Sequence, residues 1–180
     1  MIMKDLKEFS IQFVGLKEGK HEFKYSIDNK FFEAFNFDEY VSSSIEVSLN
    51  FVKKSTLFEL VFIAEGSVEV PCDVTNELYD QEIDSELPLV VKFGPEFNDE
   101  NEEILILPHE AYEFNVAQFI YEMIVLAVPN KRVHPKVLDG TMESEALTKL
   151  KELEIKKVKT VEITDPRWDK LKNLITEKKT

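Results

Sequence analysis

The stretch that decides the fold is Ile45-Glu46-Val47-Ser48-Leu49-Asn50-Phe51, in which apolar and polar side chains alternate without a break. Successive side chains of a β-strand point to opposite faces, so this period of two predicts a strand with one buried and one wet face. The polar run Lys53-Lys54-Ser55 then marks a turn. We therefore start from a sheet whose faces differ in polarity.

Similar patterns flank this stretch. Phe9 to Phe13 and Phe23 to Ile27 alternate on either side of a turn at Gly15 to Gly19, which predicts a β-hairpin. Further strands are expected at Leu57–Ile63, Val68–Val70 beyond Gly66, Leu78–Ile83, Leu89–Phe93 and Ile104–Leu107. Short strands with turns every eight to twelve residues are typical of a mostly antiparallel sheet, strongly curved or partly closed.

Two segments have helical signals. Asp28-Asn29 can cap a short helix whose apolar face is Phe31, Phe32 and Phe35; these rings belong to the core or form an exposed patch. Asn115 starts a longer apolar helix, which Pro129 ends. We expect this helix to be buried against the concave face of the sheet, with Glu122 facing solvent or paired with a lysine. The predicted fold class is α+β.

The last part of the chain differs from the rest. Residues 1–135 are predicted to be the α+β core domain, and residues 136–180 a charged linker with a C-terminal helix that docks on the core. Asp165 can cap that helix and Pro166 suits its first position, which places Trp168 on an apolar stripe. Glu143 to Glu154 fits either a thin amphipathic helix or a disordered segment.

Composition excludes several classes of protein. The 180 residues include five glycines and no phosphate-binding glycine motif, one cysteine and hence no disulfide framework, and three histidines without metalloprotease spacing. The N-terminus lacks the apolar region of a signal peptide, and the longest apolar run, near 119–128, is too short to span a membrane. We expect a cytoplasmic protein with no catalytic, cofactor or metal site.

Charge is the main constraint on partners. The net charge is −13, and it is unevenly placed: residues 149–180 carry ten Lys or Arg and six Asp or Glu, a local +4. From Glu77 to Glu103 there are ten acidic side chains and one basic one, Lys92. Such a region is either a solubilising face or a surface that receives a basic protein. Direct binding of nucleic acid is disfavoured, because it depends on Lys and Arg meeting phosphates.

Four segments, taken in order, carry a resemblance. They are Pro71-Cys72-Asp73-Val74-Thr75-Asn76, Val91-Lys92-Phe93-Gly94, Ile120 to Pro129 with His134 beyond it, and Asp165-Pro166-Arg167-Trp168. From about Phe9 to Leu174 the chain resembles the YceD family of bacterial large-ribosomal-subunit RNA accumulation proteins, in the form found in Bacteroidetes-type bacteria. The resemblance implies a role in ribosomal RNA accumulation and ribosome assembly, without catalytic activity.

The resemblance also directs attention to single residues. Where the family commonly has C-x-x-C followed by Leu, this chain keeps Cys72 and Asp73 but has Thr75 and Asn76. A tetrahedral zinc site needs more ligands than one thiolate, so no zinc is expected. Arg132 and His134 follow the long helix, where His134 either hydrogen-bonds a backbone carbonyl or joins Lys131 and Arg132 in a cationic cluster at the helix end.

The C-terminal motif supplies the remaining candidates. Arg167 is expected to pair within the chain, either with Asp165 or Asp169 or with a carboxylate of the core, and RNA phosphate is the alternative. Trp168 is expected to dock on the core or to stack on a base. The candidate interaction residues are Cys72, Asp73, Arg132, His134, Asp165, Arg167 and Trp168.

Three functions are consistent with the sequence. The first is a non-enzymatic factor in large-subunit biogenesis that binds a basic ribosomal protein or a pre-50S particle through its acidic surface, and contacts rRNA only indirectly. The second is a hydrolase with acidic residues in a curved-sheet pocket, and the third a homodimeric ligand-binding module. The sequence leaves the oligomeric state open.

Overall fold

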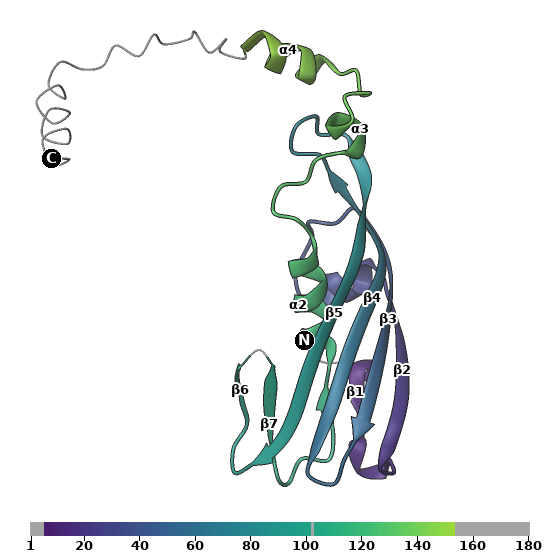
Figure 1. Ribbon diagram of the computed structural model, residues 1–180, viewed down its shortest axis with the longest axis vertical. Coiled ribbons are helices and arrows are strands. Elements are labelled where there is room, and N and C mark those ends of the chain that lie inside the picture. The colour runs from purple at the N-terminus through teal and green to yellow at the C-terminus, as the bar shows by residue number, and fades with distance from the viewer. Residues whose placement is uncertain (1–5, 102, 154–180) are drawn as a thin grey trace, which may run out of the picture. The chain divides into compact units, whose positions relative to one another are not determined.

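The computed structural model describes residues 6–101 and 103–153, and a six-stranded sheet dominates this part of the chain (Figure 1). The strand order is β2-β3-β4-β5-β7-β6. The strands are β2 (Gly19–Ile27), β3 (Ser42–Lys53), β4 (Leu57–Pro71), β5 (Leu78–Gly94), β6 (Asn98–Asn101) and β7 (Ile104–Pro108). Neighbours pair antiparallel except β5 and β7, which are parallel. The sheet is open, with β2 and β6 at its edges, so the expectation of partial closure was wrong; strong curvature stays a prediction.

The central strands are longer than the sequence indicated. β4 runs for 15 residues through Gly66, and β5 for 17 residues through the polar stretch around Ser85. Both had been predicted as pairs of short strands, because Gly and polar runs usually interrupt a strand. Gly66 is instead required for close approach: it has φ +153, and a Cβ there would lie 2.2 Å from the Ser44 carbonyl oxygen. Cross-strand pairing with β3 and β5 therefore carries β4 through this point.

The predicted N-terminal hairpin is wrong. β1 (Ser10–Ile11), between the 3₁₀ turns η2 (Lys7–Phe9) and η3 (Phe13–Gly15), pairs with β8 (Phe114–Asn115) rather than with β2. Phe9, Ile11 and Phe13 are all buried, and the Phe13 ring lies 5.1 Å from Phe58 of β4. The alternation at this end of the chain reflects packing over the sheet, and β2 pairs with β3 instead.

The short helix forms as predicted. α1 (Asn29–Ala34) begins after Asp28, whose side chain accepts a hydrogen bond from the Lys30 N–H at 3.0 Å. Phe31 and Phe32 are 5% and 2% exposed, so these rings belong to the core. The exposed aromatic patch on which the homodimer alternative rested is therefore absent at these two positions.

The second helix covers the inner face of the sheet. α2 (Ala117–Ala127) packs against β5, and its Phe119 stacks on Phe62 of β4 at 6.4 Å. Its buried residues are Ala117, Ile120, Met123 and Ile124, while Gln118, Glu122 and Leu126 are exposed. α2 is thus an amphipathic helix of 11 residues, rather than a long buried one. Glu122 faces solvent, as expected, and accepts a hydrogen bond from Gln118.

Two short helices follow α2. α3 (Pro135–Leu138) belongs to the compact unit formed by residues 1–142. α4 (Glu145–Leu153) belongs to a second unit, residues 143–180, and confirms the helical alternative for this segment. The predicted boundary after residue 135 and the predicted docking of the tail stay predictions. None of the described helices is long and apolar enough to cross a membrane.

Candidate interaction surfaces

Four of the predicted site residues come together where the β4–β5 loop meets the segment after α2. The Asp73 N–H donates to the Arg132 carbonyl at 2.8 Å, and the Arg132 N–H donates to Asp73 Oδ2 at 2.7 Å. The His134 N–H donates to Cys72 Sγ at 3.3 Å. We call this cluster of Cys72, Asp73, Arg132 and His134 the clasp. It joins two segments that lie about sixty residues apart in the sequence.

The loop itself has a tight and specific conformation. The Cys72 N–H donates to the Glu77 carbonyl at 2.9 Å, and the Asn76 N–H donates to the Cys72 carbonyl at 2.8 Å. Asn76 has φ +59, in the left-handed region that asparagine tolerates better than most residues. The asparagine at this position therefore suits the turn that presents Cys72 and Asp73 to the segment after α2.

Cys72 is buried, yet its sulfur is surrounded by donors. Its side chain is 2% exposed. Burial acts to raise the pKa of the thiol, but hydrogen bonds from the His134 backbone, the Thr75 side chain and the backbone of Val74 and Thr75 outweigh it. The net effect is a Cys72 pKa below its ordinary value. The sulfur is thus the acceptor that holds the loop closed.

His134 has a structural role in the clasp. It caps α3: its Nδ1 accepts a hydrogen bond from the Lys136 N–H at 3.0 Å, so that nitrogen carries no proton in this arrangement. Its ring lies 5.2 Å from the Tyr79 ring. It contacts Cys72 through its backbone N–H rather than through its imidazole, so the pair is not arranged as a catalytic thiol and base. The imidazole was predicted to bond a backbone carbonyl, whereas its Nδ1 accepts from the backbone N–H of Lys136.

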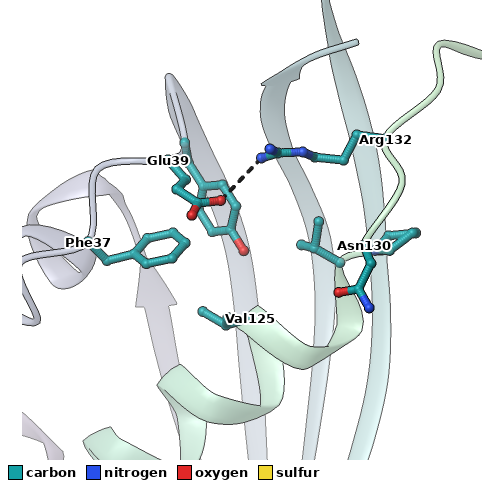
Figure 2. Close-up of a pocket in the computed structure, with 8 residues that line it drawn as sticks. Phe37, Glu39, Val125, Asn130 and Arg132 are labelled. Atoms are coloured by element: carbon teal, nitrogen blue, oxygen red, sulfur yellow. Dashed lines mark hydrogen bonds and ion pairs between the residues drawn. The ribbon is translucent and has the colours of Figure 1, made fainter. Parts of the chain in front are cut away.

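Arg132 connects the clasp to a small pocket. Its guanidinium lies 3.3 Å from Glu39 and 3.9 Å from Asp73, and Figure 2 shows Arg132 and Glu39 pointing toward each other. The pocket has a volume of about 240 Å³. Its lining is Phe37, Glu39, Tyr40, Val125, Val128, Pro129, Asn130 and Arg132. Because Arg132 already pairs with both carboxylates, the charges of this site are largely satisfied within the chain.

Two tyrosines beside the clasp have raised pKa values. Burial is the main cause of the rise in the pKa of Tyr40 to about 12, with a further contribution from the negative charge of Glu39. Burial also raises the pKa of Tyr79, helped by the negative charges of Cys72 and Asp73. Both phenols therefore stay protonated at neutral pH and serve as packing groups.

A second surface is the uncovered face of the sheet. Glu46 of β3 lies directly opposite Glu65 of β4, which lies directly opposite Asp84 of β5, and all three are exposed. We call these three residues the acidic row. Further carboxylates, from Glu69, Asp80, Glu82 and Glu86, occupy the same face in the neighbouring registers, because side chains two apart along a strand share a face.

The acidic row is unfavourable for the isolated fold. Like charges directly opposite each other on neighbouring strands destabilise a sheet, by about 0.2–1 kcal/mol per pair. Among the described residues, no Lys or Arg forms an ion pair with Glu46, Glu65 or Asp84. Within the part of the chain that the structure describes, the row therefore has no cationic side chain paired with it.

The predicted site residues and those that the structure brings together are not the same set. Asp165, Arg167 and Trp168 lie outside the described residues. Glu39, Tyr40 and Tyr79 belong to the site but were missed, because nothing in their local sequence distinguishes them from other surface acids or core aromatics. Glu39 belongs to the site because Arg132, which pairs with Asp73, also pairs with Glu39.

The residues present do not form a metal site. Cys72 is the one cysteine of the chain, Thr75 occupies the position of a second thiol, and its side chain instead donates to Cys72. Within 6–101 and 103–153 there is no cluster of three His, Cys, Asp or Glu side chains that could hold an ion. A zinc ion of the kind that the C-x-x-C pattern implies does not fit this loop.

Comparison with known protein families identifies the chain. A family model described as "Large ribosomal RNA subunit accumulation protein YceD" matches residues 60–175, which is more than half of the sequence. The chain belongs to the YceD family. The matched residues include the whole clasp, Glu65 and Asp84 of the acidic row, and the C-terminal Asp165-Pro166-Arg167-Trp168 motif. No curated protein and no solved structure matches the chain.

Membership of the YceD family agrees with the resemblance seen in the sequence. The family is named for accumulation of the large-subunit RNA and not for a reaction, which connects this chain with the large ribosomal subunit. Glu46 lies upstream of the matched residues, so the acidic row extends beyond the part that the family model covers.

Proposed function

We propose that this YceD family member is a non-catalytic factor in the accumulation of large-subunit ribosomal RNA, and that it binds a basic protein of the pre-50S particle. The observation that carries the proposal is the acidic row, Glu46–Glu65–Asp84, on the uncovered face of the sheet. The protein would act in the cytoplasm, and its effect on rRNA would be indirect.

Electrostatics favours a protein partner over naked RNA. The chain carries a net charge of −13, and RNA phosphates would be repelled by the sheet face. Proteins that bind nucleic acid carry Lys and Arg that neutralise phosphates, so their basic surfaces are complementary to a row of carboxylates. A factor that covers such a surface would keep a ribosomal protein from binding RNA at the wrong time or place.

The strength of binding would come from several charges acting together. A single exposed ion pair contributes about 0–1 kcal/mol, so one carboxylate of the row has little effect alone. Charges arranged over β3, β4 and β5 produce a common field that speeds association and weakens with salt. A partner that pairs with Glu65 would also relieve its repulsion with Glu46 and Asp84.

The experiment is co-sedimentation with pre-50S particles over a salt series. We expect the full chain to sediment with the particles at low ionic strength, and the Glu65→Lys/Asp84→Lys double variant to lose most of this association. Glu33→Lys, combined with Glu8→Lys, is the matched control, because both residues are exposed, lie off the sheet face and change the charge equally. Absence of the wild-type chain from the particles at every salt concentration would remove the proposal.

A further inference from the structure

A groove runs beside α2 on the covered side of the molecule, away from the clasp and from the acidic row. It has a volume of about 410 Å³. We call it the α2 groove, and it lies between α2, β7 and the segment that leads into β6. The side chains and backbone that line it come from Phe97, Asp99, Leu105, Leu107, Pro108, Ala111, Glu113, Phe114, Asn115, Gln118, Phe119 and Glu122.

The floor of the groove is apolar and partly open to water. Leu105, Leu107 and Phe114 are buried beneath it, Phe119 is half-buried at its side, and Phe97 is 56% exposed at its rim. An exposed phenylalanine next to an apolar floor is typical of a surface that binds another molecule.

The charged residues of the groove all have one sign of charge. Asp99, Glu113 and Glu122 line it, and no Lys, Arg or His does. Two of these carboxylates accept a hydrogen bond from a neutral amide: Gln12 donates to Glu113 at 3.4 Å and Gln118 donates to Glu122 at 2.9 Å. In the sequence, the whole segment 93–130 contains eight Asp or Glu and no Lys or Arg.

We propose that the α2 groove docks a short segment of a basic partner protein, in which a large apolar side chain is flanked by Lys or Arg. The apolar side chain would cover the floor beside Phe97 and Phe119, and the flanking cations would meet Asp99, Glu113 and Glu122. The proposal rests on the proposed function and adds the chemical identity of the segment recognised. Charge complementarity selects this occupant over an acidic or neutral one.

The ionic and the apolar contacts proposed for the groove should respond differently to salt. Pairing with exposed carboxylates weakens as salt rises, whereas burial of an apolar side chain does not. Binding at the groove should therefore fall with added salt and then level off. Binding at the acidic row, which lacks an apolar anchor, should continue to fall.

The test uses the full chain and a labelled synthetic peptide with one central tryptophan flanked by arginines. Fluorescence anisotropy should show binding, and replacing the tryptophan with serine or the arginines with glutamates should weaken it at least about tenfold, roughly 1.4 kcal/mol. On the protein side, Phe97→Ser and Glu122→Lys should each weaken binding several-fold. Their matched controls are Leu78→Ser, which is 49% exposed in β5, and Glu110→Lys, which is exposed outside the groove.

The outcomes separate the two proposals. Equal affinity for the wild-type chain and the Phe97→Ser and Glu122→Lys variants, with unchanged thermal melting, would overturn docking at the groove. If those variants still sediment with pre-50S particles while Glu65→Lys/Asp84→Lys does not, the proposed function stands and the groove has no part in it. If the peptide binds at the groove but neither the wild-type chain nor any variant sediments with the particles, docking at the groove is supported and the proposed ribosomal partner is rejected.

Discussion

At the scale of single residues, the clasp is organised around the buried sulfur of Cys72. Cys72 Sγ accepts hydrogen bonds from the His134 backbone and from its own turn, and Asp73 pairs with the Arg132 backbone in both directions. If the sulfur were removed, the half-buried N–H of His134 would lose its acceptor. The clasp thus holds the β4–β5 loop by hydrogen bonds and by the ion pair of Asp73 with Arg132.

The first prediction concerns the acceptor role of this sulfur. Cys72→Ala should lower the free energy of unfolding by about 1–3 kcal/mol, because the N–H of His134 and the turn amides lose their acceptor. Cys72→Ser keeps an acceptor and should cost less. Denaturant unfolding of the wild-type chain and both variants at neutral pH measures the difference. Equal stability of the wild-type and alanine chains would contradict the role assigned to Cys72.

The lowered pKa of Cys72 gives this effect a pH dependence. The ordinary thiol pKa is 9.0, and the folded chain releases the proton at a lower pH. Stability from the thiolate is therefore fully present above pH 9.0 and is lost as the pH falls through the folded-state pKa. The gap between wild type and Cys72→Ala should widen as the pH is raised toward 9.0. A gap that narrows over this range would show that the folded-state pKa is raised instead.

At the scale of elements, β4 is the strand on which the rest of the sheet depends. It pairs with β5 along its whole length and with β3 from Phe58 to Glu69, and its inward side chains alternate from Phe58 to Val70. Its outward side chains include Glu65, the centre of the acidic row. Gly66 follows directly, and a Cβ there would lie 2.2 Å from the Ser44 carbonyl oxygen and 2.7 Å from Ile45 Cα.

The second prediction follows from this close approach. Gly66→Ala should destabilise the chain by more than about 3 kcal/mol, because both a strained backbone and a clash with backbone atoms oppose it. Gly19→Ala is the matched control: Gly19 also has positive φ, +131, but nothing lies within 4 Å of the added Cβ. It should cost only the strain, about 1–3 kcal/mol. Thermal unfolding of both variants tests this. Equal losses of stability would show that the backbone of β3 can move away at Ser44.

The third prediction concerns the acidic row as an element of the sheet. Glu65→Gln removes the charge between Glu46 and Asp84, so it should raise the free energy of unfolding by about 0.2–1 kcal/mol. The same substitution should weaken association with pre-50S particles. Denaturant unfolding and co-sedimentation of one protein preparation measure both effects. If Glu65→Gln destabilises the fold, the row is stabilised within the chain and needs no external counter-charge.

At the scale of the whole molecule, the charge distribution opposes folding and favours association. The net charge is −13 on 180 residues, and ion pairs within the described part of the chain involve only the carboxylates of Glu22, Glu39, Glu59, Asp73 and Glu145. Self-repulsion of this kind destabilises a compact state and keeps the protein from aggregating. The same field attracts a basic partner.

The fourth prediction is that salt acts on stability and on binding in opposite directions. Screening shortens to about 10 Å at 0.1 M salt, so added NaCl should raise the melting temperature by a few degrees while it weakens particle association. Glu65→Lys/Asp84→Lys should show a smaller rise, because part of the repulsion has been removed. Melting temperatures in a NaCl series check this. A melting temperature that falls with salt would mean that attractive ion pairs dominate the surface.

Much of the fold follows from local patterns in the sequence. The alternation of Ile45 to Phe51 predicted β3, Asp28 predicted the start of α1, and Glu122 was expected to face water. These predictions succeeded because side-chain period and capping are properties of a few neighbouring residues. Family membership could also be predicted from the sequence, because several short motifs in the family's order are specific together although each one alone is not.

The tertiary structure decided what depends on residues far apart in the chain. The pairing of β1 with β8, the continuity of β4 through Gly66 and the meeting of Asp73 with Arg132 and Glu39 have no local signal. The sequence by itself determined that carboxylates are abundant and that strands alternate. Only strand register determined that Glu46, Glu65 and Asp84 stand side by side, because cross-strand neighbours are set by pairing and not by sequence separation.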